Sequence, residues 1–162
     1  IKLTDPALHS FGTALYGEIG VEGQEYELET KFIVDKQVGR NVFSMNLISE
    51  LEYEFEYDVE TRKVDRKLET PVSLTMGYLR FIGKSFGLGF EASNYNDVEA
   101  AEWNNSVWYL GPTVHARGSN WWLNFNIQPQ LFNARRSDES PRKIDTVHYD
   151  RIDARVILSF TL

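Results

Sequence analysis

The sequence predicts an all-β fold: an antiparallel, up-and-down transmembrane β-barrel with about eight visible strands, in one domain over residues 1–162. Apolar and polar side chains alternate along most of the chain with a period of two, which is the period of a strand. The alternating stretches reach ten residues or more, whereas strands of soluble domains average about 5–6 residues and tilted membrane-spanning strands need about 9–11. Short and long links alternate between the stretches, as in bacterial outer-membrane barrels, except at the tight turn Glu22-Gly23.

The pattern is clearest between Asn41 and Tyr57. Its odd positions carry the apolar residues Phe43, Met45, Leu47, Leu51, Tyr53, Phe55 and Tyr57, and its even positions from 50 onward carry Glu50, Glu52, Glu54 and Glu56. If this segment is extended, it has one apolar face and one face of carboxylates. A soluble sheet with one face on a core would show the same alternation, so the membrane interpretation depends on its recurrence in every strand.

The same alternation predicts the remaining strands. Ile1–Leu3 is expected to be the end of a preceding strand, and the sequence leaves open whether further strands come before it. The predicted strands cover residues 11–21, 24–35, 41–57, 67–78, 85–93, 108–117, 121–131 and 151–162. Long loops are predicted at DVETRKVDR, at NYNDVEAAEWNN and at ARRSDESPRKIDTVH.

Glycines and prolines add local expectations to this scheme. Gly87 and Gly89 put small residues on the polar face of the strand at 85–93, which indicates a crowded or ligand-lined side. Pro112 and Pro129 each remove a donor from a predicted strand, so local bulges are expected at these positions.

Aromatic residues gather at both ends of the predicted strands. One group falls near the periplasmic edge of a barrel: Phe11, Phe32, Phe43, Tyr78, Phe86, Trp121 and Phe160. A second group, expected at the outer edge, contains Tyr53, Phe55, Tyr57 and Trp108. Two aromatic girdles of this kind flank the apolar band of transmembrane barrels. The alternative is that these rings fill the core of a soluble protein.

Composition excludes several functional classes. The net charge of −7 argues against a nucleic-acid binder that neutralises phosphates. The chain has no cysteine, so no disulfide or thiolate metal site is available, and the glutamates lack the spacing of a calcium-binding loop. No run of 18 apolar residues exists, which excludes a transmembrane helix. We therefore expect no metal and no other cofactor.

The polar face of the strands is predicted to line the barrel lumen. The expected lumen residues are Glu25, Glu27, Glu29, Lys31, Glu50, Glu52, Glu54, Glu56, Lys67, Glu91, His115, Arg117, Asn124, Asn126, Gln128, Arg151, Asp153 and Arg155. Like charges that face each other across a sheet destabilise it, so the glutamates need compensation. Two alternatives remain: an internal network in which lysines and arginines pair with them, or a water-filled, cation-favouring channel.

Three passages also resemble a known group of proteins. LYGEIG, YELETKFIVDKQVG and YLGPTVHARGSNWWLNFNIQPQL are similar to the C-terminal part of uncharacterised bacterial outer-membrane β-barrels, some of them linked to transport in the degradation of aromatic compounds. The resemblance covers about the first 50 residues and then residues 109–131. It implies an outer-membrane barrel, a transport function and further strands before the turn at Asp5-Pro6.

The first functional hypothesis is passive transport of small solutes through a pore with an acidic lumen, in the outer membrane of a Gram-negative cell, with outer-membrane lipid as the partner. The alternative is a closed, non-conducting barrel that acts as a structural or interaction module through its external loops. An outer-membrane enzyme comes third, because His115 and His148 match no catalytic spacing motif. No catalytic residue is assigned, and the sequence identifies no partner protein.

Overall fold

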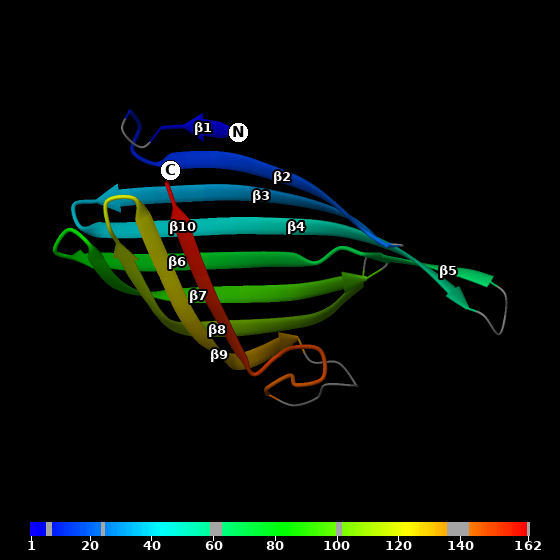
Figure 1. The fold of residues 1–162 in the computed structure, drawn as a ribbon. Helices are drawn as coiled ribbons and strands as arrows, with labels where there is room; N and C mark the ends of the chain where they lie inside the picture. Colours follow the sequence, from blue (N-terminus) through cyan, green and yellow to red (C-terminus); the bar gives the residue numbers. More distant parts are fainter. Residues whose placement is uncertain (6–7, 24, 59–62, 100–101, 136–142, 162) are drawn as a thin grey trace.

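The structure is a computed structural model that describes residues 1–162 except 6–7, 24, 59–62, 100–101, 136–142 and 162; the backbone alone is described at 56–58, 63, 65 and 99. The described chain folds into a single ten-stranded antiparallel sheet (Figure 1). Its strands are β1 (Lys2–Thr4), β2 (Gly12–Glu22), β3 (Glu25–Val38), β4 (Asn41–Asp58), β5 (Lys63–Glu69), β6 (Val72–Ile82), β7 (Phe86–Glu99), β8 (Glu102–Arg117), β9 (Trp121–Arg135) and β10 (Ile152–Phe160).

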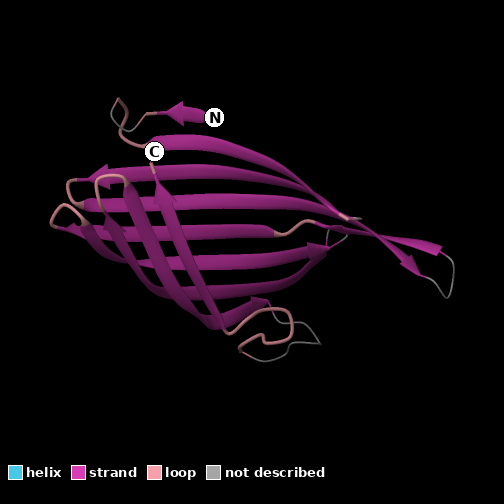
Figure 2. Ribbon diagram, in the orientation of Figure 1, coloured by secondary structure: helices cyan, strands magenta, loops and turns pink. Residues whose placement is uncertain are grey.

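The strands follow one another across the sheet in the order of the sequence. β5 and β6 both pair with β4 and occupy successive parts of one strand position, and β7 pairs with both of them. The sheet curls into a half-barrel (Figure 2). Its two edges are β10 and, at the other end, β2 with the short β1, and no ladder joins these edges among the described residues. The all-β, antiparallel prediction is confirmed to this extent.

The described residues include no helix that is long and apolar enough to cross a membrane.

Side-chain polarity is inverted relative to a soluble sheet. Among the described residues, the only fully buried hydrophobic side chains are Val107 and Tyr109, whereas the buried polar ones are Ser73, Thr75, Ser93, Asn94, Asn105, Ser106, Thr113, Asn126, Gln128, Gln130, Asn133 and Asp145. Apolar residues of the convex face are exposed instead, with Leu47 at 47% and Val156 at 65% exposure. The ladders bring these apolar residues into register, for example Leu28 with Leu51 and Val156 with Phe125.

Two of the predicted loops are wrong. Residues 63–66 of the predicted loop DVETRKVDR belong to β5, which pairs with β4, so the β4–β5 hairpin projects beyond the rest of the sheet (Figure 1). The single strand predicted at 67–78 is divided between the end of β5 and β6, which begins at Val72. Pairing of β7 with β8 also continues to Glu99 and Glu102, within the predicted loop at 94–105. In both places the backbone groups of the strands are paired, but polar residues interrupt the apolar face. The alternation of apolar and polar residues therefore did not reveal these parts of the strands.

The prolines do not cause the bulges that we expected. The shifts of register involving β8 lie between Asp97 and Val98, between Ser106 and Val107, and between Trp108 and Tyr109. The β8–β9 ladder is instead interrupted, without a change of register, between its Tyr109–Gln130 and Thr113–Asn126 pairs. Pro112 and Pro129 lie in this interruption. The backbone N–H that each proline lacks therefore removes no hydrogen bond between β8 and β9.

Candidate functional site

The acidic side of the concave face is built by the register of β2, β3, β4 and β5. Antiparallel pairing places glutamates opposite glutamates in two rows across the strands: Glu18, Glu29 and Glu50 in the first, and Glu27, Glu52 and Glu69 in the second. A third row holds Glu22, Glu25, Glu54 and Lys67. Opposed side chains on one face of a sheet lie close together, so these rows concentrate negative charge.

Lysines compensate part of this charge. Lys31 Nζ lies 3.1 Å from Glu29 Oε1, and the same ammonium group lies 5.1 Å from the ring centroid of Tyr16. Lys67 forms an ion pair with Glu69. In the part of the chain that the structure describes, no arginine is ion-paired with these glutamates. Of the predicted network, the structure therefore brings together the lysines and not the arginines.

The predicted arginines lie on the other side of the half-barrel. Arg117 donates from Nε to the Lys84 carbonyl at 2.9 Å, and its guanidinium group lies 4.8 Å from the Phe81 ring centroid. Arg155 belongs to β10, and its backbone N–H donates to Asn126 Oδ1 at 3.1 Å. Arg151 precedes β10, and its carbonyl accepts a bond from the Gln130 N–H.

The wall formed by β7, β9 and β10 is a hydrogen-bonded polar surface. Gln128 Nε2 donates to Glu91 Oε1 at 3.0 Å, and the Tyr95 hydroxyl donates to Asp153 Oδ2 at 3.1 Å. Asn124 lies 3.4 Å from the Thr113 hydroxyl. These predicted lumen residues share one face with the glutamates, whereas the side chain of Glu56 lies outside the described residues.

The segment 143–151 between β9 and β10 is a feature that the sequence analysis missed. Asp145 is fully buried, and Gln130 holds its backbone: Gln130 Nε2 donates to the Asp145 carbonyl at 2.8 Å, and the Asp145 N–H donates to Gln130 Oε1 at 2.6 Å. Asp145 Oδ1 accepts the N–H groups of Val147 and His148, and its Oδ2 lies 3.1 Å from His148 Nδ1. An aspartate side chain that accepts hydrogen bonds from backbone N–H groups two and three residues ahead is typical of a turn. Asp145 is therefore the residue of the sequence that signals this turn.

Two adjoining clefts meet at His148 and Tyr149. One cleft, of about 470 Å³, lies between these residues and the acidic wall, and the other, of about 580 Å³, lies between them and β10. Tyr95 lines both clefts. Burial, together with the negative charges of Asp97 and Asp145, raises the pKa of the Tyr149 phenol well above its ordinary value, so the phenol stays neutral.

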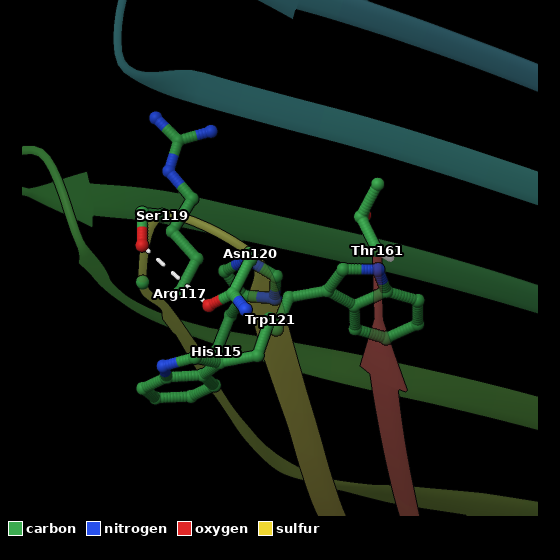
Figure 3. A pocket seen from close by; sticks show the side chains of 8 residues that line it. His115, Arg117, Ser119, Asn120, Trp121 and Thr161 are labelled. Atoms are coloured by element: carbon green, nitrogen blue, oxygen red, sulfur yellow. Dashed lines mark hydrogen bonds between the residues drawn. The ribbon is translucent and has the colours of Figure 1, made fainter.

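A third cavity lies at the turn between β8 and β9 (Figure 3). Its volume is about 410 Å³, and His115, Arg117 and Trp121 are among its lining residues. His115 stacks on Trp122 with ring centroids 6.2 Å apart, and Ser119 bonds Asn120 in the same turn. Among the described residues, His115 has no hydrogen bond to a serine.

The described residues contain no group of three or more histidines, aspartates or glutamates placed to hold a metal ion.

Comparison with protein-family models, with curated proteins and with solved structures finds no match for this chain. The resemblance to outer-membrane barrels therefore stays a prediction.

Proposed function

We propose that this chain forms the wall of an outer-membrane β-barrel whose polar, acidic interior conducts small solutes passively and favours cations. The observation that supports it best is the inverted polarity of the sheet, with apolar side chains exposed on the convex face and most of the buried polar side chains on the concave face. Bilayer hydrocarbon solvates such a convex face, whereas a soluble sheet would cover it.

Aromatic contacts at both ends of the apolar band support the same proposal. At one end Phe43 packs on Tyr78 with ring centroids 5.2 Å apart, and Phe160 is paired with Trp121. At the other end Trp108 stacks on Phe132 with ring centroids 6.4 Å apart. Girdles of this kind mark the two interfaces of a membrane-spanning barrel.

The free edges of the half-barrel set a condition for this function. Unpaired backbone groups are costly in lipid, so both β2 and β10 need a neighbouring strand. β10 runs antiparallel to β2 when directions are followed across the sheet, so the two edges are able to pair directly and close a barrel. Further strands between them would give a wider barrel. Closure with eight strand positions leaves an interior that side chains can fill, whereas a wider barrel holds water.

Planar-bilayer recordings of the purified protein test the proposal. We expect discrete channels that favour K⁺ over Cl⁻, because the glutamate rows attract cations into the lumen. The preference should fall as the KCl concentration rises and shortens the Debye length. The double variant Glu50→Gln and Glu52→Gln should conduct with reduced cation preference.

The result that contradicts the pore is a protein that inserts into the bilayer without any conductance. That result would favour the closed barrel, for which the inward-folded segment around Asp145 and the buried amides of Asn126 and Gln128 are the supporting observations. Conductance with no preference between K⁺ and Cl⁻ would contradict only the proposed role of the glutamates and would leave the pore itself intact.

A further inference from the structure

We propose that the cleft between the acidic wall and His148-Tyr149 binds a small organic cation, such as a protonated amine attached to an apolar body. The inference rests on the proposed function, since the ligand would enter through the barrel interior, and it names the class of solute that the interior selects.

The cleft is lined by residues from distant parts of the chain. Glu50 and Glu52 of β4 and Glu69 of β5 form one wall, and Tyr95 and Asp97 of β7 form another. His148 and Tyr149, on the segment anchored by Asp145, complete the lining. Its volume of about 470 Å³ falls within the about 300–1,000 Å³ that is usual for small-molecule sites.

The charge of the cleft favours a cation. Four carboxylates line it, those of Glu50, Glu52, Glu69 and Asp97. The basic groups in the lining are already engaged, because Lys67 is paired with Glu69 and His148 Nδ1 lies beside Asp145 Oδ2. Among the described side chains, no ion pair neutralises Glu50, Glu52 or Asp97. A cationic ligand would therefore supply the compensation that the glutamate rows lack.

The aromatic rings distinguish an organic cation from an inorganic one. Tyr95 and Tyr149 both line the cleft, and the Tyr95 ring is held by its hydroxyl bond to Asp153 and by an edge-to-face contact with Tyr109 at 5.6 Å. Tyrosine rings attract ammonium groups with their faces and can cover an apolar body. A hydrated metal ion would gain little from them.

Isothermal titration calorimetry of the full chain, folded in detergent micelles, tests this site with three probes of similar shape. We expect phenethylamine to bind at least about tenfold more tightly than neutral 2-phenylethanol or anionic phenylacetate. Glu52→Gln should weaken phenethylamine binding about tenfold, and Tyr149→Leu should weaken it as well. Asp97→Asn is a second charge variant in case Glu52→Gln does not fold.

The matched control is Asp35→Asn, which removes the same charge from the concave face of β3 at its opposite end, away from the cleft. It should leave phenethylamine affinity unchanged. Equal affinity for the three probes, equal losses at positions 35 and 52, or complete displacement of phenethylamine by Mg²⁺ at equal ionic strength would each overturn the proposal.

Bilayer recordings on the same preparations separate the two proposals. Conductance without phenethylamine binding refutes the cleft and leaves the pore intact. Phenethylamine binding without conductance refutes the pore and supports a ligand-binding barrel.

Discussion

Replacing Leu47 with arginine is expected to destabilise the protein by about 2–4 kcal/mol in lipid vesicles, because in the proposed outer-membrane barrel the arginine would place a charge on the lipid-facing surface near the bilayer midplane. Leu47 is 47% exposed on the convex face and is paired with Phe32 and Leu74. In a soluble protein, a change at such an exposed position would alter stability by about 0.5 kcal/mol or less. Urea unfolding in vesicles, followed by tryptophan fluorescence, measures the difference.

The matched control is Ser44→Arg, three residues earlier on the same strand and on the concave face. Ser44 is exposed and lines a cavity together with Glu91 and Asn124, so an arginine there should be tolerated. Equal penalties at positions 44 and 47 would contradict a lipid-facing convex surface.

Alanine at Gly111 is expected to destabilise the sheet strongly, whatever surrounds it. An added Cβ would lie 1.8 Å from the carbonyl oxygen of Ile127, and a Cβ at Gly89 would lie 1.8 Å from that of Tyr78. These neighbours are backbone atoms of adjacent strands, so the strands themselves must separate. Overpacking of a well-packed core typically costs about 1–3 kcal/mol, and we expect Gly111→Ala to reach the upper end of that range or to prevent folding.

Gly17→Ala provides the control for this prediction. The nearest atom to its added Cβ is the Glu29 carbonyl oxygen at 3.9 Å, an ordinary contact. The urea midpoint should therefore change little in Gly17→Ala and fall markedly in Gly111→Ala. Equal effects in the two variants would show that the sheet opens at Gly111 more easily than its geometry implies.

The strands and their faces could be predicted because a period of two survives wherever one face is apolar. The first part of β5 could not, since residues 63–66 carry charges at successive positions and look like a solvated loop. Its pairing with β4 becomes visible only in three dimensions, where Glu54 lies opposite Lys67. The crowding that Gly87 and Gly89 indicated is present, because a Cβ at either position would meet β6.

The candidate site was predictable only in part. Alternation assigned Glu50 and Glu52 to the polar face, but which glutamates meet depends on register, which the turns fix after the strands form. The contribution of His148 and Tyr149 depends on the turn at Asp145, which has no periodicity to detect.

The order of pairing in the sheet has a kinetic consequence. Every ladder among the described strands joins strands that are consecutive or separated by one, as with β4 and β6. Such near-neighbour contacts form quickly, because each requires only a short loop to close. The contact between the β2 and β10 edges is different, since it would join residues 12–22 to residues 152–160. We therefore expect the hairpins to form early and, in the proposed barrel, pairing of the β2 and β10 edges to be the slow, last step, so that a curled, open sheet accumulates before the barrel closes.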